Sequence, residues 1–178
     1  MKNKLRSIVL TIAIITLAMT SIVRASYVLP YPSYMPGHKL YRMARFMDEV
    51  KRYWYWGNLA SYRYYLGQSD KALVEAKTLF EYHQYLLAFN ALERSNTALQ
   101  RVPDTLIRAK DEGKNIAKYR QEFQEAMDEH KRLIAKLKQE TPEEFTWTPE
   151  KSDSQVLPIH QALSEAERTR NDAVTKVP

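Results

Sequence analysis

Four histidines are the side chains best suited to chemistry in this chain of 178 residues: His38, His83, His130 and His160. A di-iron helical bundle places a Glu three residues before a ligand His. The residues at that offset are Met35, Phe80, Met127 and Leu157. His83 and His130 fall on different predicted helices, where Glu81 or Glu129 could complete a metal site. Because the usual ligand spacings are missing, we expect no metal, and a metal-binding bundle is the weakest alternative.

Other catalytic signatures are missing as well. The sequence has no G-x-S-x-G, H-E-x-x-H, phosphate-binding loop or dinucleotide fingerprint, and its four glycines offer little for building a phosphate cradle. It has no cysteine, which excludes disulfides, thiolate metal ligands and covalent haem attachment. Glu143 and Glu144 are adjacent carboxylates, but they fall in a predicted flexible tail where nothing desolvates them. We therefore expect no enzyme, no catalytic residues and no cofactor.

The formal charge of +6 comes largely from the first 25 residues. That stretch holds four basic residues and no acidic one, so the remainder has 23 basic against 21 acidic side chains. A nucleic-acid-binding domain would show a concentrated basic face, and the pattern contains none. We expect no nucleic-acid partner.

The first 25 residues resemble a secretory signal. Lys2, Lys4 and Arg6 precede an apolar run, and residues 23–25 offer small side chains for cleavage. An uncleaved anchor is the alternative, since residues 7–23 are nearly long enough to span a thinned bilayer. Either way the rest of the chain is expected outside the cytoplasm. We expect membrane contact only through an uncleaved leader, whereas a protein partner in the envelope is compatible with the sequence.

Residues 26–38 form a proline- and tyrosine-rich arm. Its prolines favour an extended, polyproline-like backbone, and Pro36 with Gly37 predicts a turn. The arm could be a docking peptide for an aromatic groove. The favoured interpretation is an arm that Tyr31, Tyr34 and Met35 hold along the folded domain, because a bare proline pattern is weak evidence for docking.

The central part of the chain has the apolar spacing of four amphipathic helices. Steps of three and four predict helices over residues 39–53, 58–78, 80–111 and 116–139. The third helix is expected to kink, but not to break, at Pro103. Short connections between such helices predict an all-α, up-down-up-down four-helix bundle over residues 39–140.

A cluster of four aromatic residues ends the first predicted helix: Tyr53, Trp54, Tyr55 and Trp56. It could be a sugar-stacking or membrane-interface platform. The favoured interpretation is a plug that closes one end of the bundle and leaves at least one ring exposed. Together with Tyr31 and Tyr34, these four residues are the candidate interaction surface.

Residues 141–178 change character. Their first half is proline-interrupted and charged, which predicts a flexible linker, and residues 158–174 could form a short, mostly polar helix. Phe145 and Trp147 either pin this tail to the bundle or attract a partner. The pattern does not choose between these alternatives.

Two segments carry a family resemblance: LPYPSYMPGHKLY at residues 29–41 and ALVEAKTLFEYHQYLLAFNALERSNTAL at residues 72–99. With the preceding signal sequence they make residues 29–137 similar to a bacterial family of extracytoplasmic helical domains known only as a domain of unknown function. The resemblance implies a helical fold outside the cytoplasm, and it supplies no activity, ligand or catalytic residue.

These observations predict a non-enzymatic interaction or structural module of the bacterial cell envelope. The first alternative is an extracytoplasmic chaperone or stress-sensing bundle, which would need a concave apolar face. The oligomeric state and the identity of any partner stay open.

Overall fold

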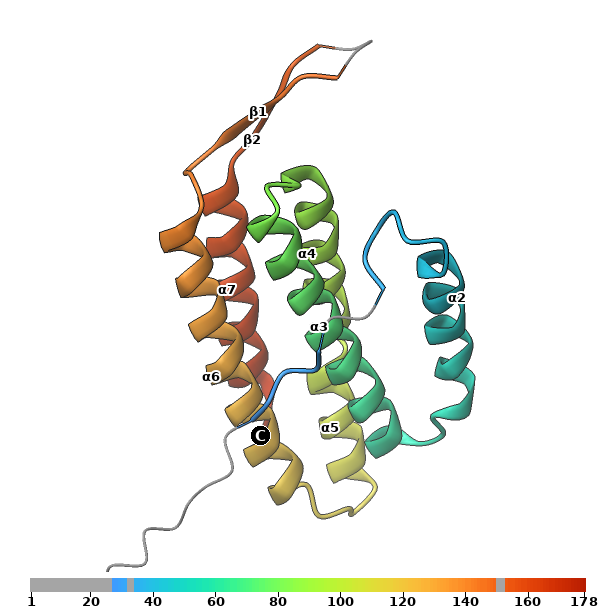
Figure 1. Ribbon diagram of the computed structural model, residues 1–178. Coiled ribbons are helices and arrows are strands. Elements are labelled where there is room, and N and C mark those ends of the chain that lie inside the picture. Colours follow the sequence, from blue (N-terminus) through green and yellow to red (C-terminus); the bar gives the residue numbers. More distant parts are fainter. Residues whose placement is uncertain (1–26, 32–33, 150–152) are drawn as a thin grey trace, which may run out of the picture.

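The chain is mainly helical, as Figure 1 shows for the computed structural model, which describes residues 27–31, 34–149 and 153–178. The predicted leader lies outside the described residues. The helices are α2 (Tyr41–Lys51), a short 3-10 turn η1 (Arg52–Trp54), α3 (Asn58–Glu81), α4 (Tyr85–Leu99), α5 (Val102–Asp111), α6 (Ala117–Glu140) and α7 (Ile159–Lys176). Strands β1 (Phe145–Trp147) and β2 (Gln155–Leu157) pair antiparallel, with Phe145 opposite Leu157. The all-α expectation is therefore right apart from this small strand pair.

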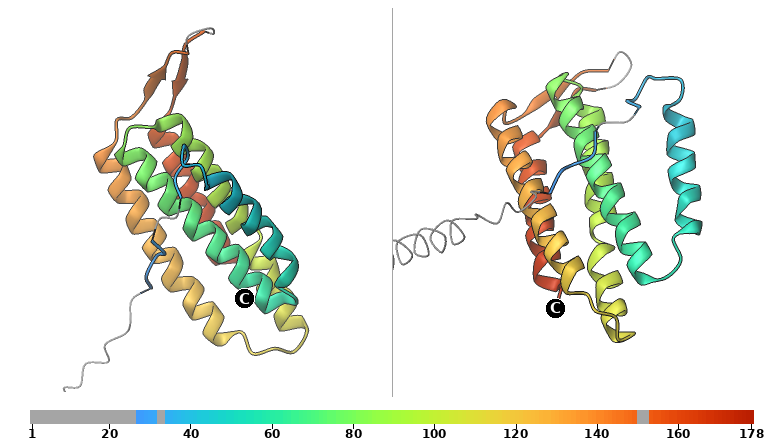
Figure 2. Two further views of the ribbon diagram at one scale, coloured as in Figure 1. Left: turned by 45° about the vertical axis from the view of Figure 1, so that its right-hand side comes forward. Right: turned by 60° about the horizontal axis from the view of Figure 1, so that its bottom comes forward.

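The part of the molecule that we call the body consists of helices α3, α4, α5, α6 and α7, which pack side by side. Helix α3 contacts α4, α5 and α6, and α7 contacts α6 and α4. The views of Figure 2 show α7 lying along α6 for most of its length. Their amphipathic stripes explain this packing, because an apolar face must be buried against another element.

The core of the body consists of two apolar clusters. One lies towards the α3–α4 turn and includes Leu73, Phe80 and Leu163. The other lies towards the α5–α6 turn and includes Leu66 and Phe123. Between them, each of four helices contributes buried polar residues: Ser69 and Asp70 from α3, Ser95 from α4, His130 from α6 and Arg170 from α7. We call this set the polar layer.

The prediction that residues 39–53 belong to the helical core is wrong. Helix α2 lies at the edge of the molecule beside α3 (Figure 2), and it has no buried residue. Its expected core positions Met43 and Met47 are exposed. The physical reason is that α7 covers α4 and α6 and completes the core without α2.

The prediction of a flexible C-terminal tail is wrong, whereas the helix considered over residues 158–174 is confirmed and is longer and more buried than expected. Residues 159–176 form α7, and Ile159, Leu163 and Ala166 are fully buried. Strands β1 and β2 form a hairpin that projects from one end of the body (Figure 1). Phe145 packs on Tyr85 with 4.7 Å between ring centroids, so it pins the hairpin to α4.

The helix predicted over residues 80–111 is interrupted. Helix α4 ends at Leu99 and α5 begins at Val102, with Pro103 in its first turn. Proline has no backbone N–H to donate. In the first turn of a helix a backbone N–H would have no intrahelical acceptor, so its absence costs little there. Starting a new helix at Val102 therefore costs less free energy than placing Pro103 inside an unbroken helix. Helix α5 continues along the body in the direction of α4 (Figure 1). Leu99 of α4 and Leu106 of α5 are both fully buried, so the apolar stripe continues from one helix to the next.

Candidate interaction surface

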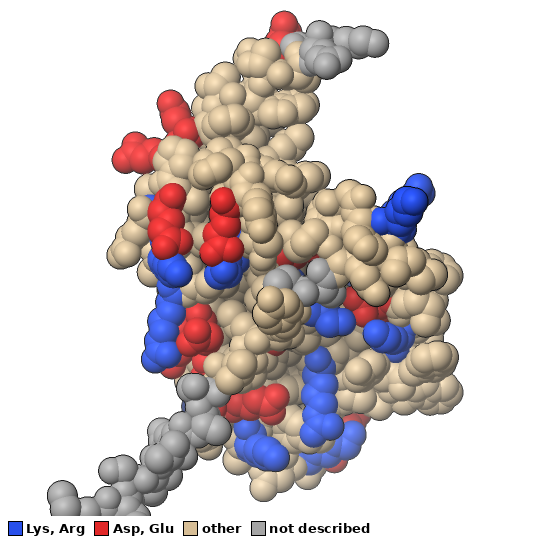
Figure 3. All heavy atoms as spheres, in the orientation of Figure 1, with Lys and Arg blue, Asp and Glu red and all other residues tan. Residues whose placement is uncertain are grey.

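Helix α2 is amphipathic, but its apolar side faces away from the body. Phe46 is 63 % exposed and Met43 is 57 % exposed, whereas such residues are normally buried. We define the outer face of α2 as its exposed apolar side chains with the aromatic residues that follow: Leu40, Met43, Phe46, Met47, Tyr53, Trp54, Tyr55 and Trp56. In Figure 3 the right-hand edge, where α2 lies, is tan over most of its extent.

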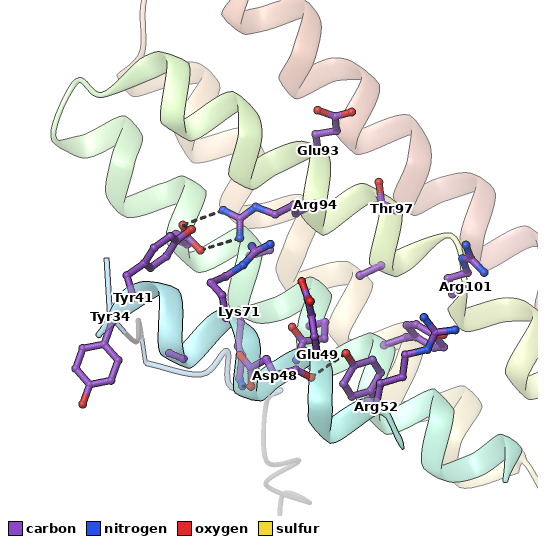
Figure 4. A pocket seen from close by; sticks show the side chains of 18 residues that line it. Tyr34, Tyr41, Asp48, Glu49, Arg52, Lys71, Glu93, Arg94, Thr97 and Arg101 are labelled. Carbon is purple, nitrogen blue, oxygen red and sulfur yellow. Dashed lines mark hydrogen bonds and ion pairs between the residues drawn. The ribbon is translucent and has the colours of Figure 1, made fainter. Parts of the chain in front are cut away.

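The opposite, polar side of α2 faces α3 and α4 across a cleft of about 410 Å³. Figure 4 shows Tyr41 and Asp48 from α2 and Arg52 from η1 on one wall of this cleft, and Lys71 and Arg94 from the body on the other. The lining is dominated by charged side chains and tyrosines.

Specific polar contacts across the cleft fix the orientation of α2. The Tyr41 hydroxyl donates to Glu75 Oε1 at 2.8 Å, and Arg94 donates to both carboxylate oxygens of Glu75 at 2.8 and 3.2 Å. Lys71 pairs with Asp48 at 3.1 Å. Partial burial and the hydrogen bond to Glu75 raise the pKa of Tyr41, so its hydroxyl stays protonated and can donate. These contacts direct the polar side of α2 towards the body and leave most of its apolar side exposed.

The aromatic cluster does not plug the end of the body, so the favoured interpretation is wrong. Trp56 is 84 % exposed, and Tyr53 and Trp54 are also mostly exposed. Only Tyr55 has a described ring partner, Tyr64 of α3, at 5.4 Å between centroids. The four rings are exposed because this segment connects α2 to α3 at the edge of the molecule and does not cover the ends of the body helices (Figure 1).

The arm is held to the body by one residue that was expected, Met35, and by one that was not, Tyr27. Tyr31 is 93 % exposed, and Tyr34 stacks on His38 of the arm itself. Met35 does pack against the apolar core, as predicted. The second anchor is Tyr27, whose hydroxyl donates to the buried carboxylate of Asp70. Tyr27 could not be singled out from the sequence, because this residue lies close to the end of the leader and belongs to no apolar repeat at helical spacing.

The two histidines considered as metal ligands lie in different environments. His130 is fully buried and donates from Nε2 to Asp70 Oδ1 at 2.8 Å. His83 is exposed in the α3–α4 turn, where Nδ1 lies 2.9 Å from the Tyr85 hydroxyl. Within the described ranges, no three His, Asp or Glu side chains are grouped closely enough to hold a metal ion.

The polar layer neutralises its own charges inside the core. Arg170 donates to Ser95 Oγ at 2.7 Å, to the Ala166 carbonyl at 2.9 Å and to Asn96 Oδ1. Burial lowers the pKa of Arg170 to about 10, and the negative charge of Asp70 opposes that shift. Burial also lowers the pKa of His130, and its hydrogen bond to Asp70 opposes the effect. The charges of Asp70 and Arg170 thus attract each other within the polar layer, and burial favours the neutral form of His130.

Protein stability is expected to fall when the pH drops below about 6.5, the ordinary pKa of histidine. Below that value the unfolded chain binds a proton at His130 and the folded chain does not, so the free energy of unfolding decreases with falling pH. The groups facing His130 are Asp70, Arg170 and Glu129. Urea unfolding at pH 7.5 and 5.5 should differ by about 1 kcal/mol from this residue. His130→Gln should flatten the dependence, and an unchanged pH dependence in that variant would contradict the assignment.

Comparison of the chain with protein-family models, with curated proteins and with solved structures gives no match. Among the described residues, no helix is long and apolar enough to cross a membrane. Function must therefore be argued from the surface of this molecule alone.

Proposed function

We propose that this protein is a non-enzymatic interaction module of the bacterial cell envelope, exported by its N-terminal leader, and that the outer face of α2 is its contact surface. The observation that carries the proposal is the orientation of α2. Its apolar side chains face solvent while its polar side chains face the body. Exposed apolar patches on a folded protein commonly mark interaction sites.

The body serves in this proposal as a rigid mount for α2. We propose that α3, the α4–α5 pair, α6 and α7 form an up-down-up-down bundle, which is supported by the short turns from α3 to α4 and from α5 to α6 and by the buried polar residues that these helices contribute. The resemblance of residues 29–137 to extracytoplasmic helical domains supports the same role, and we propose membership of that family.

The lining of the cleft beside α2 argues against the alternative function of a chaperone or stress-sensing bundle. A chaperone or stress-sensing bundle would need a concave apolar surface, whereas this cleft is lined mostly by charged residues and tyrosines. The exposed apolar side chains lie instead on a single helix at the edge of the molecule. These features favour docking onto one surface over enclosure of unfolded chains.

A labelling experiment in cells tests the proposal, because the chain has no cysteine of its own. Met43→Cys places a thiol on the outer face of α2, and Arg132→Cys places one on α6 as a matched exposed control. Each full-length variant is expressed in its native bacterium and treated with a maleimide that does not cross the cytoplasmic membrane. The same reaction is measured on purified protein.

Export predicts that the control thiol is labelled in intact cells. Occupation of the outer face predicts that the thiol at position 43 reacts at least about tenfold more slowly in cells than when purified, because a covered thiol is inaccessible. An unlabelled control would refute the localisation. Equal reaction rates at position 43 in cells and in solution would refute the contact surface.

A further inference from the structure

The outer face of α2 has the composition of a surface that lies at the boundary between lipid and water. Phe46 and Met43 provide exposed apolar side chains along the helix, and Trp54 and Trp56 follow at its end. Tryptophan and tyrosine favour this boundary because each ring joins an apolar body to one polar group. Helices with an apolar face and a polar face lie flat in the headgroup region with the apolar face inserted.

Basic residues border this face. At about 100° per residue, Arg42 and Lys51 fall at its two edges, and Lys39 precedes its first turn. Residues 39–56 hold five basic and two acidic side chains, of which Arg45, Arg52 and both acidic residues line the cleft, so Lys39, Arg42 and Lys51 remain to border the outer face. One of the two acidic residues, Asp48, is directed towards the cleft, where it pairs with Lys71. Lys51 also contacts Asp48, while within the described part of the chain Arg42 forms no ion pair. Long basic side chains at the edge of an apolar face can reach anionic headgroups.

The same charges disfavour a second copy of this chain as the occupant. A twofold contact brings identical surfaces together, so the basic edges of one helix would face the basic edges of the other. An anionic bilayer instead supplies the opposite charge along both edges and apolar chains between them. The position of α2 at the edge of the molecule (Figure 2) lets it reach a flat surface.

We infer that the outer face of α2 binds the surface of an anionic phospholipid bilayer, with α2 lying in the headgroup region. This inference rests on the proposed function and names the occupant of its contact surface. The inference also places a membrane contact on α2, whereas the sequence predicts membrane contact only through an uncleaved leader. The cleft, with its charged walls, remains on the water side of the helix.

The test uses protein purified from the envelope, whose N-terminus is read by mass spectrometry, and vesicles of phosphatidylcholine with about one third phosphatidylglycerol. Met43→Glu with Phe46→Glu alters the outer face of α2. Tyr82→Glu with Val156→Glu makes the same charge change at exposed apolar residues elsewhere and serves as the matched control. All forms keep the same N-terminus, so a retained leader contributes equally to each.

Wild-type and control protein should bind these vesicles, and the α2 variant should bind at least about tenfold more weakly. Vesicles of phosphatidylcholine alone should bind the wild type more weakly. Circular dichroism should be the same for all forms, because the substituted side chains are exposed. Equal vesicle binding by the α2 variant, or no binding by the wild type, would overturn the inference.

Two further outcomes separate this inference from the proposed function. A dimer that the α2 variant abolishes, without vesicle binding, would assign the face to a second copy. Protection of Met43→Cys in cells without vesicle binding would assign it to a protein. Either result overturns the lipid inference and leaves the proposed function standing, whereas unprotected Met43→Cys removes both.

Discussion

Leu163→Asp is expected to unfold most of the protein at room temperature. Leu163 is fully buried in the apolar cluster that α7 shares with α3, α4 and α6. Truncating a buried leucine costs about 2–5 kcal/mol, and burying an unpaired carboxylate adds to that cost. The sum is at least about 5 kcal/mol, which equals the whole stability of many domains of this size.

Urea unfolding and the near-ultraviolet dichroism of the aromatic residues measure this effect. Ser164→Asp is the matched control, because the neighbouring Ser164 is exposed on the same helix. It should change the free energy of unfolding by no more than about 0.5 kcal/mol. If Leu163→Asp kept wild-type stability, α7 would be dispensable and residues 141–178 would be the flexible tail that their composition indicates.

The composition of α7 concealed a regular pattern. Its buried residues recur at steps of three and four: Ile159, Leu163, Ala166, Arg170, Ala173 and Val177. This is the spacing of a core-facing helix, but two of the positions are alanine and one is arginine. Small and charged residues on the stripe made the helix look mostly polar, so spacing alone would have been the better guide.

Helices α3 and α6 could be predicted because several large apolar residues mark their stripes. Tyr62, Leu66 and Phe80 of α3 are buried as expected, as are Phe123 and Ile134 of α6. The same argument failed for α2. Periodicity shows that a helix has an apolar side, but it does not show which surface covers that side. The six candidate interaction residues are all exposed, and their role in an interaction stays a prediction.

The polar layer could be predicted only in part. Ser69 and His130 each fall between apolar residues at helical spacing, so the sequence places them on the buried stripes of their helices. Asp70 is one residue off the α3 stripe, and Arg170 stood in the presumed tail. No local pattern connects residues about 100 positions apart in the chain, so their mutual neutralisation follows only from the packing of α3 against its neighbours.

Asp70→Asn is expected to destabilise the protein by about 3 kcal/mol, because it leaves the buried charge of Arg170 without its counter-charge. The substitution preserves shape and one acceptor oxygen for Tyr27 or His130. Electrostatics is therefore the main change. Urea unfolding measures the loss. Asp128→Asn is the control, because it removes an exposed carboxylate that pairs with Lys131 on α6. This control should lower the free energy of unfolding by about 0.5 kcal/mol or less.

A double-mutant cycle shows whether charge or packing causes the loss. Arg170→Met alone should also destabilise, because it leaves the charge of Asp70 buried and removes the hydrogen bond that Arg170 donates to Ser95. Combined with Asp70→Asn, it removes both charges, so the double variant should be more stable than the sum of the single effects predicts by at least about 1 kcal/mol. Additive losses would mean that Asp70 and Arg170 act independently. Coupling would mean that the charges of Asp70 in α3 and Arg170 in α7 stabilise each other inside the body on which α2 is mounted.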